Sequence, residues 1–158
     1  MPAGRFHRIT VAIDGSPIAH EALLVAIDLA GRYGSEVQIV AVAPLLPVYV
    51  SAAEPYVSVN VMQSDVERYR AIVDAAVKEA EAAGLTSVTG VAEEGVVVDE
   101  LLALLEKSPP DLLVMGSRGL STAKRLMLGS VSDAIVHHAT CPVLVVRTPA
   151  TTPARPAG

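Results

Sequence analysis

The sequence is poor in aromatic residues and in positive charge, and both shortages exclude classes of partner. Aromatic residues make up 3% of the 158 residues, with one Phe and no Trp, so the stacking platforms that bind single-stranded nucleic acid are missing. The 12 Lys and Arg residues are scattered and the net charge is −5, which leaves no basic stripe for a phosphate backbone. We therefore expect no nucleic-acid partner.

Cysteine and long apolar runs are also scarce. Cys141 stands alone, so no disulfide can form within the chain, as is compatible with a reducing compartment. We interpret Cys141 as a small buried hydrophobe. Apolar residues make up 51% of the chain, but no stretch approaches about 18 uninterrupted apolar residues, and the first residues contain no apolar signal core. We therefore expect a soluble cytoplasmic protein with no membrane partner.

The length suits one ordinary globular domain, which can bury a core without disulfides or a structural metal. We expect this single domain to span residues 1–148. The last residues, 149–158, are rich in Pro and Thr and contain almost no bulky apolar side chain. This composition predicts a disordered tail.

Along the chain, short apolar runs alternate with longer amphipathic segments, which predicts a parallel sheet with crossover helices. The five expected strands cover residues 8–13, 37–42, 87–92, 112–115 and 143–146. The four expected helices carry apolar residues at helical spacing and cover residues 17–33, 64–83, 96–107 and 130–139.

The composition of segment 44–63 differs from that of the rest of the chain. It holds Pro44, Pro47 and Pro55 among many apolar residues, which predicts an irregular connection. Its lack of charge would suit a lid over a ligand site or a buried contact with a partner. Simple packing on the domain would explain the composition as well, so the three interpretations stay open.

The strongest motif follows the strand at 112–115. The chain runs through GSRG at residues 116–119 and nine further residues, and then GSVS at 129–132 opens the last helix. In an open parallel sheet, ligands bind beyond the carboxyl ends of the strands where the strand order reverses, and strands 8–13 and 112–115 would flank that crevice. Gly116 and Gly119 allow a tight turn and a close approach to a ligand. The unpaired amides at the helix start then favour an anion, so the motif predicts a phosphate-binding loop.

Two further features of this loop have alternative interpretations. The hydroxyls of Ser130 and Ser132 can donate to phosphate oxygens or contact a magnesium ion. Lys124 and Arg125 could neutralise phosphate charge, although solvated cations of an exposed loop are an equally simple reading. The glycines themselves also serve ordinary turns and helix caps in many folds.

The segment GSRGLSTAKRLMLGS at residues 116–130 resembles the ATP-binding branch of the universal stress protein family. That branch carries Gly, two residues, Gly, nine residues, and then Gly followed by Ser or Thr. The resemblance extends over residues 8–147 and includes Asp14-Gly15-Ser16 after the first strand. It implies a three-layer Rossmann-like α/β fold (adenine nucleotide alpha hydrolase-like) with a five-stranded parallel sheet of order 3-2-1-4-5. It also implies homodimers through the last strand, Val143–Val146, whose apolar edge would favour pairing.

The resemblance also implies roles for individual residues. Asp14 would contact the ribose or the magnesium side of ATP, Val42 would bind the adenine through its main chain, and Gly116 would lie near the ribose. The phosphates would be surrounded by backbone amides and hydroxyls of Gly119, Gly129, Ser130, Val131 and Ser132. From its position alone, Asp14 could accept a ribose hydroxyl at the end of the first strand, or it could be a turn carboxylate.

These expectations favour a stress-response regulator whose bound ATP, together with Mg2+, sets its shape or its partners. One alternative is a slow ATPase or nucleotidyl-transfer enzyme. We find neither a Walker loop nor a residue placed to activate water, so we expect at most slow hydrolysis. The other alternative is a nucleotide-free dimeric interaction module, against which the intact glycine motif argues. The residues do not distinguish ATP from AMP or a cyclic nucleotide.

Overall fold

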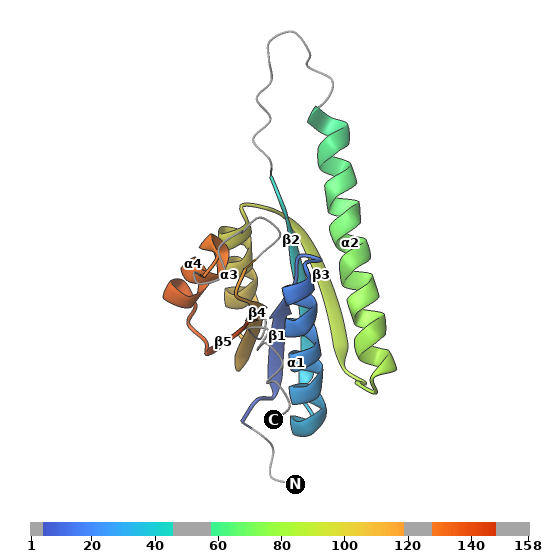
Figure 1. The fold of residues 1–158 in the computed structure, drawn as a ribbon, viewed down its shortest axis with the longest axis vertical. Coiled ribbons are helices and arrows are strands. Elements are labelled where there is room, and N and C mark those ends of the chain that lie inside the picture. Colours follow the sequence, from blue (N-terminus) through green and yellow to red (C-terminus); the bar gives the residue numbers. More distant parts are fainter. Residues whose placement is uncertain (1–4, 46–57, 119–127, 148–158) are drawn as a thin grey trace, which may run out of the picture.

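The protein forms one five-stranded parallel sheet covered by helices on both faces (Figure 1). This computed structural model describes residues 5–45, 58–118 and 128–147, with the backbone alone for 58–64. The strand order is β3-β2-β1-β4-β5. The strands are β1 (Arg8–Ala12), β2 (Glu36–Pro44), β3 (Val88–Gly95), β4 (Leu112–Gly116) and β5 (Val143–Val146). The predicted fold class and the order 3-2-1-4-5 are confirmed.

The helices divide between the two faces of the sheet. They are α1 (Pro17–Tyr33), α2 (Ser58–Ala82), α3 (Val97–Lys107) and α4 (Ser130–His138). Helices α1 and α2 cover one face and α3 and α4 the other (Figure 1). Each face has its own apolar cluster, one containing Ile9 and Val11 and the other Leu113 and Met115. The chain therefore folds into three layers.

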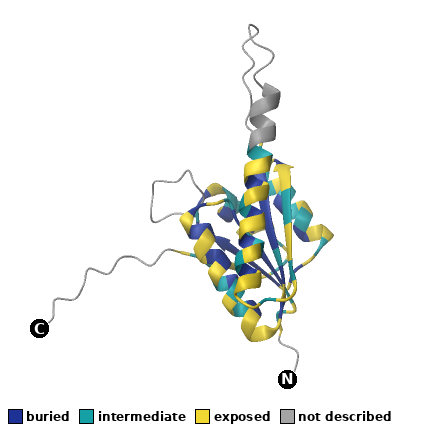
Figure 2. Ribbon diagram, turned by 90° about the vertical axis from the view of Figure 1, so that its right-hand side faces the viewer, coloured by how far each residue is buried: buried dark blue, intermediate teal, exposed yellow. Residues whose placement is uncertain are grey.

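The central strands are buried because both of their faces are covered, which explains their continuous apolar runs. All five residues of β4 are buried, and so are residues 39–43 of β2. Figure 2 shows this arrangement as buried strands behind helices whose outer faces are exposed. Within the described ranges, no helix is both long enough and apolar enough to cross a membrane.

Three boundaries differ from the sequence prediction by two residues or more. Helix α2 begins at Ser58, so residues 58–63, which we expected in an irregular connection, are helical. The prolines that suggested a loop end at Pro55, and a lack of charge is no obstacle to a helix. Strands β2 and β3 continue to the pair Pro44↔Gly95, farther than expected, because Pro44 keeps a carbonyl for pairing although it lacks an N–H group. Residues 46–57, which include most of the expected connection, and the predicted tail at 149–158 lie outside the described residues.

Asp111 ties the start of β1 to the start of β4. Its Oδ2 accepts hydrogen bonds from the backbone N–H groups of Arg8 (2.9 Å) and His7 (2.8 Å), while its own N–H donates to the Arg8 carbonyl at 2.9 Å. The N–H of Arg8, helped by that of His7, lowers the pKa of Asp111 below its ordinary value. The ionised carboxylate is therefore favoured in the folded state.

We expect Asp111→Asn to lower the melting temperature at pH 7 by about 2–4 °C, because an amide oxygen accepts these two bonds more weakly. The pKa of Asp111 is lower in the folded protein than in the unfolded chain, where it is about 3.9. Asp111 therefore stabilises the fold fully above about pH 4, and this stabilisation is lost as the pH falls through the folded pKa. The difference between the two proteins should therefore shrink below about pH 4. Thermal unfolding across pH checks this.

The control is Asp28→Asn, which changes a carboxylate exposed on α1 and paired with Arg32 at 2.9 Å. This variant should shift the melting temperature by less than about 1 °C. Equal melting temperatures of wild type and Asp111→Asn at pH 7 would contradict the prediction.

Candidate functional site

The candidate site lies at the carboxyl ends of β1 and β4. From β1 the chain winds outward to β2 and β3 on one side, while β4 and β5 lie on the other side. The strand order thus reverses between β1 and β4, where parallel sheets bind ligands. Ala12 pairs with Met115, so the segments that follow these two residues begin side by side. The prediction that β1 and β4 lie on either side of the reversal is confirmed, whereas ligand binding at this point stays a prediction.

The turn after β1 holds Asp14 in place. Asp14 Oδ1 accepts a hydrogen bond from the Ser16 N–H at 2.9 Å, and Ser16 Oγ caps α1 by accepting from the Ala19 N–H at 3.2 Å. Gly15 has φ +82°, a conformation that favours glycine. A Cβ there would lie 2.8 Å from Ile72 Cδ1 of α2. One oxygen of Asp14 therefore stabilises the turn. Within the described residues, no hydrogen bond reaches its other oxygen.

Gly116 brings helix α1 close to the end of β4. A Cβ at Gly116 would lie 3.0 Å from Ile18 Cγ2 and 3.3 Å from the Ile18 carbonyl carbon and oxygen. Any side chain would push the first turn of α1 away from the strand. Gly116 thus has a packing role that places the Asp14 turn beside the end of β4.

The two ends of the glycine-rich segment meet at Ser117. The Ser117 N–H donates to the Val146 carbonyl of β5 at 2.8 Å. The Ser117 carbonyl accepts from the Gly129 N–H at 2.8 Å and from Ser132 Oγ at 2.7 Å. Residues 119–127, which include Gly119, Lys124 and Arg125, lie outside the described residues. Ser117 is not among the residues that the motif predicts, because its contribution comes from its backbone and no side-chain pattern signals it.

Helix α4 begins at this edge, and its first amides have no acceptor among the described residues. Gly129 is its N-cap, with no side-chain cap hydrogen bond, and the Gly129 carbonyl accepts from the Asp133 N–H at 2.9 Å. The N–H groups of Ser130 and Val131 belong to the first turn, where a helix has no internal acceptors. Such amides attract anions. The structure therefore brings Gly129, Ser130 and Val131 to the same edge as Asp14 and Gly116.

The two serine hydroxyls of this turn differ. Ser132 is 2% exposed, and its hydroxyl lies 2.7 Å from the Ser117 carbonyl and 3.0 Å from the Gly129 carbonyl. A hydroxyl has one proton to donate, so Ser132 Oγ, which we expected to donate to phosphate, uses that proton to hold the loop closed. Ser130 is exposed and its hydroxyl is in a position to meet a ligand.

The backbone of Val42 faces the end of β1. The Val40 carbonyl accepts from the Ile13 N–H at 2.9 Å, and backbone groups two residues apart in a strand point to the same side. The N–H and carbonyl of Val42 therefore point past the end of β1, and within the described ranges neither bonds to the turn at 13–15. One donor and one acceptor side by side can recognise the edge of a base.

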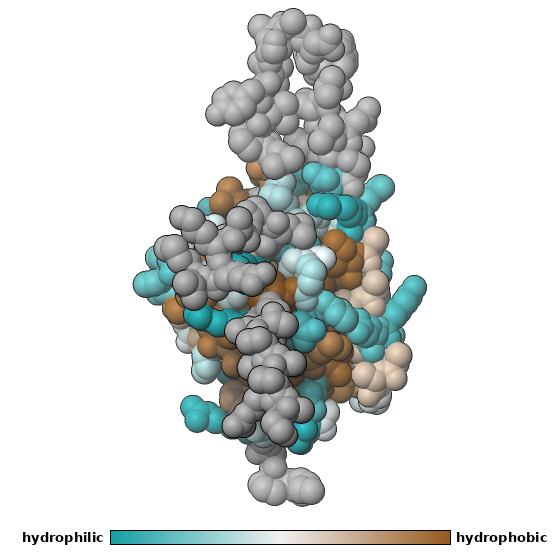
Figure 3. Space-filling model, viewed as in Figure 1, coloured by the Kyte–Doolittle hydropathy of each residue, from teal (hydrophilic) through white to brown (hydrophobic). Residues whose placement is uncertain are grey.

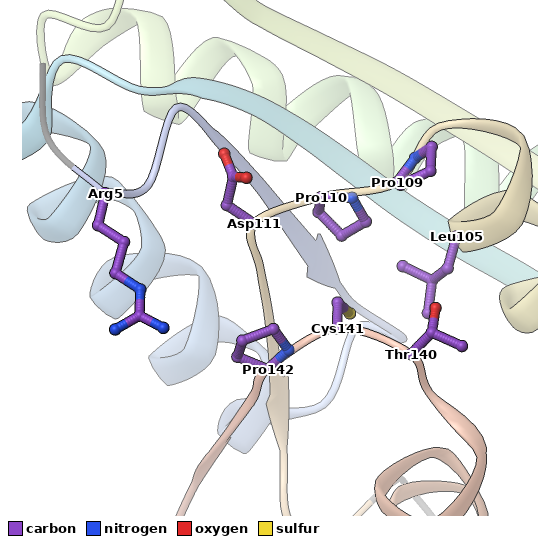
Figure 4. A pocket seen from close by; sticks show the side chains of 8 residues that line it. All are labelled: Arg5, Leu105, Pro109, Pro110, Asp111, Thr140, Cys141 and Pro142. Atoms are coloured by element: carbon purple, nitrogen blue, oxygen red, sulfur yellow. The ribbon is translucent and has the colours of Figure 1, made fainter.

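A separate hollow of about 340 Å³ lies at the opposite edge of the sheet (Figure 4). Prolines 109, 110 and 142 surround Cys141 there, together with Leu105. Burial raises the pKa of the Cys141 thiol, which keeps it protonated at neutral pH. Cys141 is only half-buried, so it is less buried than the sequence suggested, and the hollow is not part of the candidate site.

Neither a metal cluster among the described residues nor, on the visible part of the face drawn in Figure 3, one continuous polar stripe is present. No group of three or more His, Cys, Asp or Glu residues in the described part of the chain could hold a metal ion. On the face drawn in Figure 3, hydrophilic residues form separate groups and apolar residues reach the surface between them. The polar groups of the described site are therefore mainly backbone amides and carbonyls, with Asp14 and Ser130 as side chains.

The different environments of the two serines give a stability prediction. Ser132→Ala should lower the free energy of unfolding by about 1–2 kcal/mol, because a buried hydrogen bond to the Ser117 carbonyl is lost. Ser130→Ala, its matched control on the exposed side of the same turn, should change it by less than about 0.5 kcal/mol. Urea unfolding monitored by circular dichroism measures both values. Equal losses in the two variants would show that the Ser132 bond does not hold the loop.

The fold and the site define a class: a doubly wound α/β protein with a candidate ligand site at its strand-order reversal. The profile of the universal stress protein family matches residues 5–147. A universal stress protein of Methanocaldococcus jannaschii is 31% identical over 147 residues, covering 91% of this chain and 84% of that protein. YxiE of Bacillus subtilis is 33% identical over 148 residues, covering 90% and 99%. The chain belongs to the universal stress protein family.

Solved structures share the fold. The universal stress protein UspA from Lactobacillus plantarum has a TM-score of 0.81 at 21% identity, covering 91% of this chain and 99% of that one. A universal stress protein in complex with cAMP has a TM-score of 0.70 at 26% identity, covering 92% and 99%. A universal stress protein from Archaeoglobus fulgidus in complex with dAMP has a TM-score of 0.61 at 19% identity, covering 91% and 100%.

Proposed function

We propose that this protein binds ATP, or another adenine nucleotide, and acts as a nucleotide-dependent regulator in the stress response. The observation that carries the proposal is the start of α4, whose unpaired amides lie at the same sheet edge as Asp14. The binding residues would be Asp14, Val42, Gly116, Gly119, Gly129, Ser130 and Val131, while Ser132, which we expected to bind phosphate, would support the turn that presents them. Family members crystallised with cAMP and dAMP support an adenine nucleotide as the ligand class. A cytoplasmic location, where ATP is available, belongs to the same proposal.

The phosphates would bind at the first turn of α4. The N–H groups of Ser130 and Val131 supply donors and the positive end of the helix dipole supplies charge. The Ser130 hydroxyl adds a donor, while Ser132 acts by holding Gly129 and Ser117 together. Magnesium bound with ATP usually takes most of its ligands from phosphate and water, so a dedicated protein cluster is not required.

The nucleoside would lie between the ends of β1 and β2. The Val42 N–H and carbonyl offer a donor and an acceptor to the adenine edge, and the free oxygen of Asp14 offers an acceptor to a ribose hydroxyl. Hydrolysis needs a group that activates water and a cation that stabilises the transferred phosphoryl group. Backbone amides bind phosphate without activating water, so ATP hydrolysis would be slow at most.

The first test of this function uses the nucleotide that the protein carries when purified. Protein prepared without added nucleotide is denatured in acid, and any released molecule is identified by chromatography and mass spectrometry. We expect adenine nucleotide from the wild type and less than about a tenth as much from the double variant Gly119→Ala, Gly129→Ala. A Cβ at Gly129 would lie 3.3 Å from the Arg118 Cα and 3.5 Å from the Ser117 carbonyl oxygen, so it would displace the turn that presents the amides.

The matched control is Gly31→Ala, because a Cβ at Gly31 in α1 would have no atom within 4 Å. This variant should carry as much nucleotide as the wild type. An empty wild-type protein that also shows no thermal shift with millimolar ATP and Mg2+ would refute nucleotide binding. The protein would then be treated as a dimeric interaction module.

We also propose that the protein forms homodimers through β5. The two edge strands of the sheet differ: β5 is wholly apolar, with Leu144 37% exposed, whereas β3 carries the exposed charges of Glu93 and Glu94. Charged side chains disfavour edge-to-edge pairing, and an apolar edge favours it. A two-fold axis beside β5 would join two sheets into one.

Val145→Lys should convert dimers into monomers, because the substitution places a charge in the middle of the apolar edge. Sedimentation equilibrium gives the mass. The control is Thr89→Lys, which adds the same charge at an exposed position of β3 and should leave the dimer intact. A dimer mass for Val145→Lys would rule out β5 as the interface.

A further inference from the structure

Helix α2 stands beside the candidate site. In Figure 1 its first turns extend beyond the carboxyl edge of the sheet. Where α2 passes that edge, Ile72 fills the space next to Gly15, so closely that a Cβ at Gly15 would lie 2.8 Å from Ile72 Cδ1. Helix α2 therefore packs directly on the turn that carries Asp14.

Tyr69 lies one turn before Ile72 on the same face of α2. Because α2 runs antiparallel to the strands it connects, this position is nearer the carboxyl edge of the sheet. The residue is 5% exposed and belongs to the same apolar cluster as Ile13, the residue before Asp14. The Arg68 guanidinium lies 5.2 Å from the centroid of the Tyr69 ring. The ring is thus held between the core and Arg68, so its orientation is restricted.

The phenol of Tyr69 is within electrostatic reach of Asp14. Burial raises the pKa of Tyr69 and the nearby Arg68 lowers it, while the negative charges of Asp14 and Asp65 raise it further. The net increase keeps the phenol protonated at neutral pH, so it can donate a hydrogen bond. No hydrogen bond joins Tyr69 to Asp14 among the contacts of the described residues. The packing of α2 on the Asp14 turn places Tyr69 near this carboxylate, and a ligand hydroxyl between a donor and an acceptor can bond to both.

We propose that Tyr69 is a positioning residue of the nucleotide site, whose phenol donates a hydrogen bond to the same ribose hydroxyl that donates to Asp14. This inference rests on the proposed function and adds α2 to the elements that form the site. A deoxynucleotide that lacks this hydroxyl would leave both the Tyr69 phenol and the Asp14 carboxylate unpaired, so the site would bind it more weakly. The site would therefore select a ribonucleotide over one of its deoxy analogues.

The test compares three nucleotides by isothermal titration calorimetry on the full chain with Mg2+: ATP, 2′-deoxy-ATP and 3′-deoxy-ATP. Tyr69→Phe keeps the ring in the core and removes only the hydroxyl. This variant should bind ATP about 3- to 10-fold more weakly than the wild type does. Its affinity for the analogue that lacks the contacted hydroxyl should fall by less than about 2-fold. The control is Tyr33→Phe, which removes a hydroxyl from a residue 44% exposed at the far end of α1. This control should bind all three nucleotides as the wild type does.

Three results would overturn the inference. If Tyr69→Phe binds ATP as tightly as the wild type, the phenol does not contact the ligand. If it weakens all three nucleotides equally, Tyr69 acts only through the packing of α2. If the wild type binds none of them, the proposed function fails and this inference fails with it, whereas the first two results leave nucleotide binding intact.

Discussion

The parallel pairing of β1 with β4 is the interaction on which the rest of the structure depends. It joins the half of the sheet that grows outward through β2 and β3 to the half that contains β5. It also sets the point at which the strand order reverses, and a crevice can form at that point. Gly116 makes this junction compact, because its missing side chain lets Ile18 approach the end of β4.

The backbone of Ser117 links two surfaces that serve different purposes. Its carbonyl holds the start of α4, where phosphate would bind, and its N–H holds the last residue of β5, at the edge where a second chain would pair. The two groups belong to neighbouring peptide units that share the Ser117 Cα, so one short stretch of backbone is bonded at both surfaces. A ligand that displaced α4 would act on this stretch, and any coupling between the two surfaces would be reciprocal.

The fold could be predicted from the sequence because buried parallel strands leave a strong local signal. Residues 39–43 of β2 and the whole of β4 form continuous buried runs, and such runs predict parallel strands covered on both faces. The glycine pattern predicts a site at the carboxyl edge of the sheet, and that part stays a prediction. The predicted start of α2 was wrong because the prolines and the lack of charge in segment 44–63 indicated a loop. Residues from Ser58 on contain no proline and form a helix. The use of the Ser132 hydroxyl, the contact of Ile72 with Gly15 and the position of Tyr69 could not be predicted, since each depends on packing between segments distant in sequence.

The pairing of Ile9 with Leu112 joins residues roughly a hundred positions apart, and such contacts form slowly because a long loop must close first. During synthesis, β1, β2 and β3 emerge and can associate before β4 exists. In that interval the edge of β1 that will receive β4 is unpaired and apolar, which makes the nascent chain prone to aggregation. The crevice is complete only after this last central pairing, so a ligand bound there would distinguish finished molecules from partly folded ones and would stabilise only the former.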